Sequence, residues 1–216
     1  MADQLALDLH NRDNWSRDAF LIGGPNQKAV QIIDKWPNWP QRTLLIHGPA
    51  GCGKTHLAHL AAQQSGGLIL SAGQLNDLSW RGHAHVVLED FGDDAYSEKA
   101  LFHLINWVRE ERGSLLITSR LAPSDWPITL KDLRSRMNAI VAVEIAQPND
   151  ILLTQMLVKD FANVGIVPSE DVVGFIEKRI PRSFSAVRQA VFELNRAAYA
   201  EKTRVTVPFV KRVMRW

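Results

Sequence analysis

The stretch that most constrains this chain is a glycine-rich loop at residues 48–55, which reads Gly48-Pro49-Ala50-Gly51-Cys52-Gly53-Lys54-Thr55. A short apolar run precedes it at 43–47 and an Ala- and Leu-rich run follows it at 57–62, so the local order is strand, loop, helix. In that setting the glycines let successive backbone N–H groups turn towards one anionic centre at the start of the helix. We call residues 48–55 the phosphate loop.

The phosphate loop predicts nucleotide binding. Lys54 is expected to reach the β- and γ-phosphates, and Thr55 is expected to offer its hydroxyl to Mg²⁺. We include the whole loop and the following His56 in the predicted nucleotide contacts. The alternative is a chance glycine loop, which the placement between a strand and a helix disfavours.

Acidic and polar residues follow two later apolar runs. Glu89-Asp90 comes after the run at 84–88, and Ser119 comes after the run at 115–118. At the end of a buried strand in such a protein, acidic residues hold Mg²⁺ and orient the attacking water. The usual order puts Asp first, so either Glu89 contacts the metal through water or Asp90 is the ligand; a helix-capping pair is the structural alternative. We expect Ser119 to reach a γ-phosphate or the attacking water.

Composition sets limits on location. The 216 residues are 46% hydrophobic and 22% charged, as in ordinary globular proteins. The apolar runs are well short of the roughly 20 residues that span a bilayer. The first ten residues carry Asp3 and Asp8 and no basic region, so we expect no membrane segment, no signal peptide and a cytoplasmic location.

Charge, cysteine and histidine usage bear on nucleic-acid binding, disulfide formation and metal binding. A net charge of +2 is too weak to indicate nucleic-acid binding by itself, so any such contact would have to be local. Cys52 is the single cysteine and cannot form an internal disulfide. The close pairs His56/His59 and His83/His85 lack Cys or carboxylates at ligand spacing, so we interpret them as core or solvated residues, not metal ligands.

The order of apolar runs predicts an α/β fold with a five-stranded parallel sheet flanked by helices. We expect strands at 43–47, 68–71, 84–88, 115–118 and 139–143, and helices at 28–35, 97–112 and 130–137. From residue 147 only helices follow, at 151–164, 169–178, 183–202 and 208–214, with prolines at their starts or stops. The predicted parts are an N-terminal peptide at 1–12, a nucleotide-binding α/β domain at 13–146 and a small helical domain at 147–216.

The N-terminal peptide alternates apolar and polar residues. Leu5, Leu7 and Leu9 share one side of an extended segment, which indicates an edge strand or a peptide that docks into another protein. The stretch from Gln4 to Leu9 resembles the short Gln-Leu-x-Leu-x-Leu/Phe peptide by which bacterial replication proteins bind the sliding clamp. This resemblance predicts Gln4, Leu5, Leu7 and Leu9 as partner-binding residues.

Several segments together resemble the AAA+ ATPases, and within them the DnaA-like family. The segments are 20–27, 48–55, 88–90, 118–120, 133–137, 186–188 and 194–196, in family order and spacing. A replication initiator of this family should continue into a helix-turn-helix DNA-binding domain, yet only fourteen residues follow Lys202. An initiator-like body with a clamp-type peptide and without that domain resembles the Hda group, the regulatory inactivators of DnaA.

The resemblance implies a fold, partners and site residues. The fold is the AAA+ P-loop NTPase fold, in which the helical domain acts as a lid. The implied protein binds ADP or ATP with Mg²⁺, is held on DNA through the β sliding clamp of DNA polymerase III, and promotes hydrolysis of ATP by DnaA, with little or no ATPase activity of its own. Arg136 matches the arginine finger that acts in trans, with Arg134 as the rival, and Arg188 matches the second sensor of the helical domain.

Two other functions stay open at this point. One is a DNA-acting ATPase, such as a helicase loader or an initiator-like protein, which requires a basic surface and a salt-dependent affinity for DNA. The other is a small-molecule kinase, for which the sequence offers no acceptor pocket. The sequence also leaves open whether the bound nucleotide is ADP or ATP, how fast the protein itself hydrolyses ATP, and whether the chain forms a homo-oligomer.

Overall fold

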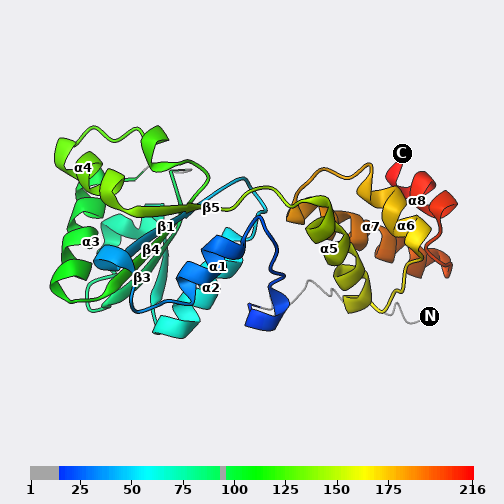
Figure 1. The fold of residues 1–216 in the computed structure, drawn as a ribbon, viewed down its shortest axis with the longest axis horizontal. Coiled ribbons are helices and arrows are strands. Elements are labelled where there is room, and N and C mark those ends of the chain that lie inside the picture. The colour runs from blue at the N-terminus through cyan, green and yellow to red at the C-terminus, as the bar shows by residue number, and fades with distance from the viewer. Residues whose placement is uncertain (1–14, 93–95) are drawn as a thin grey trace, which may run out of the picture.

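The computed structural model describes residues 15–92 and 96–216, and its centre is a parallel sheet. The five strands follow the order β2-β3-β4-β1-β5 (Figure 1). Their bounds are Thr43–His47 (β1), Leu68–Ser71 (β2), His85–Phe91 (β3), Ser114–Ser119 (β4) and Val141–Glu144 (β5). Every neighbouring pair is parallel, which confirms the predicted α/β sheet.

Helices cover both faces of the sheet. They are α1 (Gln27–Ile33) and α2 (Lys54–Ser65) on one face, and α3 (Glu98–Glu110) and α4 (Lys131–Ala139) on the other. Along β1, Leu44 and Ile46 pack with α1 and α2, whereas Leu45 packs with α3 and α4. The strand is therefore buried on both faces, which is why its sequence is a continuous apolar run rather than an alternating one.

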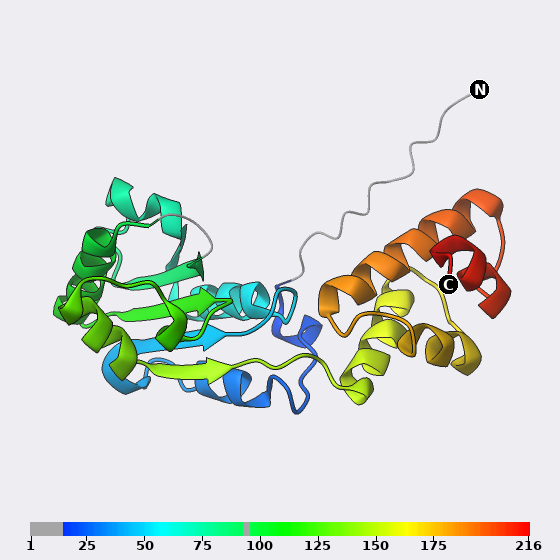
Figure 2. The same cartoon turned by 90° about the horizontal axis from the view of Figure 1, so that it is seen from above.

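A helical domain follows β5 and lies beside the α/β part (Figures 1 and 2). Its helices are α5 (Asp150–Asn163), α6 (Glu170–Glu177), α7 (Phe184–Glu201) and α8 (Val207–Met214). The side chains of Asn149, Ser183 and Thr206 accept hydrogen bonds from the first turns of α5, α7 and α8, as N-caps do. The buried residues of these helices continue the core formed by α1, α2 and the sheet.

Several element bounds differ from the sequence prediction. β3 runs on through Glu89 and Asp90 to Phe91, with an irregularity between Leu88 and Phe91. β5 begins at Val141 and not at 139, because α4 continues to Ala139. Within residues 15–92 and 96–216, four short 3-10 helices were not predicted: η1 (Arg17–Ala19), η2 (Pro40–Arg42), η3 (Ala72–Asp77) and η4 (Pro123–Asp125). No helix of the described residues is long and apolar enough to cross a membrane.

Candidate nucleotide-binding site

The phosphate loop joins β1 to α2 in a conformation that depends on glycine. Gly51 and Gly53 have φ angles of +71° and +101°, which side chains other than glycine rarely adopt. A Cβ on Gly48 would lie 2.3 Å from the Ile145 carbonyl oxygen, and one on Gly53 would lie 2.9 Å from Phe20 Cε2. Neighbouring segments thus press directly against the loop, and a side chain at these positions would displace them.

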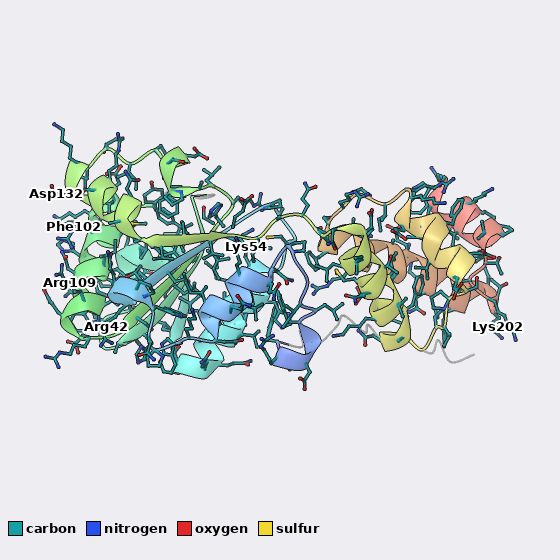
Figure 3. The ribbon with its side chains drawn as sticks, viewed as in Figure 1. Arg42, Lys54, Phe102, Arg109, Asp132 and Lys202 are labelled. Carbon is teal, nitrogen blue, oxygen red and sulfur yellow. The ribbon has the colours of Figure 1, made fainter. Side chains whose placement is uncertain are left out.

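Lys54 begins α2 and lies inside the curve of the loop. Its side chain is buried, with the residue only 5% exposed. Its Nζ donates hydrogen bonds to the carbonyl oxygens of Gly48 at 3.0 Å and Pro49 at 3.1 Å. An ammonium group therefore lies beside the unpaired N–H groups that begin a helix, and this donor set fits a phosphate group. Figure 3 shows Lys54 at the side of the sheet that faces the helical domain.

Glu89 is the acidic residue that the structure places beside Thr55. Burial raises the pKa of the Glu89 carboxyl, while a hydrogen bond from Thr55 and the charges of His59 and Lys54 act in the opposite direction. Its Oε1 is buried and has no hydrogen-bond partner among the described residues. A carboxylate oxygen without a partner next to a hydroxyl is a donor set that fits Mg²⁺.

Asp90 has a different environment. It is exposed, its φ is +48°, and its backbone N–H donates to Thr118 Oγ1 at 3.1 Å. The hydrogen bond holds the irregular turn of β3 against β4. Among the described residues, no group of three or more His, Cys, Asp or Glu side chains could hold a metal ion.

Ser119 is fully buried at the end of β4. Its Oγ accepts hydrogen bonds from the Leu121 backbone N–H at 3.0 Å and from Trp126 Nε1 at 3.1 Å. The hydroxyl therefore holds the chain that leaves the strand. The sequence did not predict this contact with Trp126, because the contact joins the end of β4 to the residue that follows η4.

His56 belongs to an aromatic cluster beside the loop. Its Nε2 lies 3.0 Å from the Ser16 carbonyl oxygen, and since a carbonyl only accepts, Nε2 donates. Trp15 and Phe20 meet its ring edge to face at 5.3 and 5.0 Å, and Trp15 stacks on His59 at 4.2 Å. Burial lowers the pKa of His56, because it disfavours the charged form of the ring. The sequence analysis predicted His56 as a site residue but missed Trp15. A single aromatic residue in a sequence does not by itself indicate a role in a site.

The helical domain brings charged residues to the same region. Arg188 is exposed on α7, and its positive charge helps to lower the pKa of His56 and opposes the rise in the pKa of Asp160 that burial causes. Lys159 Nζ donates to the carbonyl oxygens of Asp18 at 2.9 Å and Ala19 at 3.1 Å. Arg188 was predicted from the sequence, whereas Lys159 and Asp160 were missed because nothing in α5 marks them.

Arg136 lies on α4 and contacts residues of α3. Its NH1 donates to Asn106 Oδ1 at 2.9 Å, and its guanidinium lies 4.8 Å from the centre of the Phe102 ring. Figure 3 shows Phe102 and Asp132, which belong to α3 and α4, at the end of the sheet away from Lys54. The rival, Arg134, donates through Nε to the Ile128 carbonyl oxygen at 3.0 Å. The predicted clamp-binding residues Gln4, Leu5, Leu7 and Leu9 lie outside the described residues.

Solved structures with this fold include DNA replication proteins. Domain III of the Thermotoga maritima initiator DnaA matches with a TM-score of 0.81 and 16% identity, over 94% of this chain and 96% of that one. AMPPCP-bound DnaA from Aquifex aeolicus matches with a TM-score of 0.71 and 14% identity, over 88% of this chain and 69% of that one. The T. maritima RuvB branch migration motor matches with a TM-score of 0.69 and 16% identity, over 90% of this chain and 69% of that one. These similarities show that the chain has the fold of its AAA+ neighbours.

A family model described as the lid domain of Hda matches residues 152–214. The chain is thus similar to Hda in its helical domain, and to the replication initiator DnaA in sequence and fold. The initiator protein DnaA of Wolinella succinogenes is 22% identical over 94% of this chain and 52% of its own length. DnaA of Campylobacter curvus is 23% identical over 93% of this chain and 52% of its own length. The chain thus spans about half the length of these relatives.

Proposed function

We propose that this protein is a nucleotide-bound regulator of replication initiation, which attaches to the sliding clamp and stimulates ATP hydrolysis by DnaA. In this proposal residues 1–12 bind the clamp, 13–146 bind the nucleotide and present the arginine finger, and 147–216 form the lid. The protein works in the cytoplasm, where the chromosome is replicated. The match to the Hda lid supports the choice of a regulator over an initiator.

The nucleotide is held by the phosphate loop, with Lys54 on the phosphates and Arg188 reaching it from the lid. Thr55 and Glu89 would hold Mg²⁺, with Asp90 as the alternative ligand, and the metal would neutralise phosphate charge. We propose ADP as the resident nucleotide, because burial raises the pKa of Glu89, one of the groups expected to orient the attacking water.

The observation that carries the proposal is the position of Arg136. Its guanidinium contacts the Phe102 ring, and Figure 3 shows Phe102 well away from Lys54. Arg136 is therefore better placed to meet the nucleotide of another molecule than its own. There it would stabilise the charge that develops on the transferred phosphoryl group. Such an arginine supplied in trans increases the rate by about 10³ to 10⁵.

The proposal is tested by mixing the protein with DNA-loaded clamp and ATP-loaded DnaA and measuring phosphate release. We expect Arg136→Ala to lose stimulation by about 10³ while it keeps the wild-type affinity for ADP in calorimetry. Arg134→Ala is the matched control on the same helix and should stay active. If Arg136→Ala is as active as the wild type, the assignment of the finger is wrong.

A second variant tests the clamp. Replacing Leu5, Leu7 and Leu9 with Ala should abolish capture by immobilised clamp and the clamp-dependent part of the stimulation, with ADP binding unchanged. Retained clamp affinity would contradict the role of the N-terminal peptide. Failure of the wild type to stimulate DnaA at all would contradict the proposed function itself.

A further inference from the structure

The charge of this chain is distributed unevenly along the sequence. Residues 178–216 contain ten of the 25 Lys and Arg residues but only two of the 23 Asp and Glu residues. The net charge of +2 therefore hides an excess of eight positive charges in this segment, offset by an acidic remainder. The argument from net charge against direct contact with nucleic acid consequently does not apply to the helical domain.

These cations point to solvent and are largely unpaired. All ten are exposed: Lys178, Arg179, Arg182, Arg188, Arg196, Lys202, Arg204, Lys211, Arg212 and Arg215. Within the described part of the chain, only Arg182 and Arg212 form ion pairs, with Asp150 and Glu201. Cations near the C-terminal end of a helix offset its dipole, but that effect requires one or two of them and not an excess of eight.

Part of this charge forms one face where α6 and α8 pack together. The Arg179 guanidinium lies 3.8 Å and the Lys211 Nζ 5.4 Å from the centre of the Phe175 ring, and the Trp216 ring centre lies 6.4 Å from it. We call Arg179 and Lys211, which meet at Phe175, together with the exposed Lys178 and Arg215 at the ends of the same two helices, the distal basic face. Figures 1 and 2 show α6 and α8 in the helical domain, well away from the sheet.

We infer that the distal basic face binds the phosphate backbone of duplex DNA directly. Exposed Lys and Arg clustered on one face are the electrostatic signature of nucleic-acid binding, and the backbone of a duplex carries one negative charge per about 1.7 Å of helix axis. Arg179 covers the Phe175 ring, so that ring does not offer a free surface on which an unpaired base could stack. The contact is with phosphates and is independent of base sequence.

This inference does not depend on the proposed function, in which DNA is reached only through the clamp. It is tested by fluorescence anisotropy of the full chain with a labelled duplex across a salt series. We expect the wild type to bind with a dissociation constant in the range of about 10⁻⁶ to 10⁻⁴ M near physiological salt, and more tightly at lower salt. Absence of binding at about 50 mM salt would overturn the inference.

Matched charge reversals locate the site. The triple variant Lys178→Glu, Lys211→Glu, Arg215→Glu should bind at least tenfold more weakly, and its salt slope should fall by about 2 to 3 if each lysine or arginine neutralises one phosphate. The control Lys28→Glu, Lys35→Glu, Lys99→Glu makes the same change in net charge at exposed positions of the α/β part and should bind within twofold of the wild type. An equal loss in the control would show that total charge, and not this face, is responsible.

Two further readouts keep the result interpretable. Circular dichroism melting and ADP binding should be unchanged in both variants, because every substituted side chain is exposed. A labelled single strand is run beside the duplex, and a tenfold preference for the single strand would overturn the duplex assignment. If the face variant keeps duplex binding but loses affinity for clamp or DnaA, the face binds an acidic protein and the inference is wrong.

Discussion

A methyl group on Gly51 would lie 2.6 Å from the hydroxyl oxygen of Ser185, so the phosphate loop and the first turn of α7 are in direct contact. Ser185 belongs to the helical domain, and Ser183 caps the same helix two residues earlier. The lid is therefore packed on the phosphate loop. A change in the shape of the loop must be accommodated by α7.

Gly51→Ala should weaken ADP binding and destabilise the protein. The substitution places a side chain at φ +71° and against Ser185, and strain of this kind costs about 1–3 kcal/mol. Gly174→Ala is the matched control, because Gly174 lies within α6 with open space around its Cα. It should stabilise the protein by about 0.5–1 kcal/mol. Urea unfolding and calorimetry with ADP measure both effects, and equal effects of the two variants would contradict the prediction.

Glu89→Gln should stabilise the nucleotide-free protein at neutral pH. Burial raises the pKa of Glu89 above its usual 4.5, so the folded chain holds that proton more tightly than the unfolded chain. Stability is then lost as the pH rises from 4.5 towards the raised value, and the glutamine variant lacks this loss. Thermal unfolding between acidic and neutral pH should show a difference that grows with pH. The same variant should bind ADP with less dependence on Mg²⁺, and a variant less stable than the wild type at pH 7 would contradict the prediction.

Glu98→Gln should lower the stimulation of DnaA several-fold. The Glu98 carboxylate accepts hydrogen bonds from the backbone N–H groups of Thr129 at 2.7 Å and Leu130 at 2.8 Å, immediately before α4 and therefore upstream of Arg136. The Thr129 hydrogen bond is the main cause that lowers the pKa of Glu98, so this contribution is present above the usual 4.5 and is lost as the pH falls through the lowered value.

A control on the same helix separates position from charge. Glu110→Gln removes one negative charge at the exposed end of α3 and should leave stimulation and stability unchanged. Phosphate release by DnaA and thermal unfolding at two pH values measure both variants. If Glu98→Gln stimulates DnaA as the wild type does, the hydrogen bonds from Thr129 and Leu130 to Glu98 are not needed to position α4.

The order of elements could be predicted because each depends on a local signal. The glycine spacing marks the phosphate loop, and continuous apolar runs such as Leu44 to Ile46 mark strands that are buried on both faces. The contacts within the site could not be predicted, because they join residues far apart in the chain. Lys159 reaches back to Asp18, and the burial that affects Glu89 depends on how α2 packs against β3.

The segment just after the N-terminal peptide contacts both the phosphate loop and the helical domain, through Phe20 and Lys159. Phe20 presses on Gly53 of the phosphate loop, and Lys159 ties the adjacent backbone to the lid. If the N-terminal peptide binds the clamp as proposed, a force on it would be transmitted through this segment to the phosphate loop and to α5. In the proposed function, the residues that bind the clamp thus lie close in sequence to Phe20, which contacts the phosphate loop.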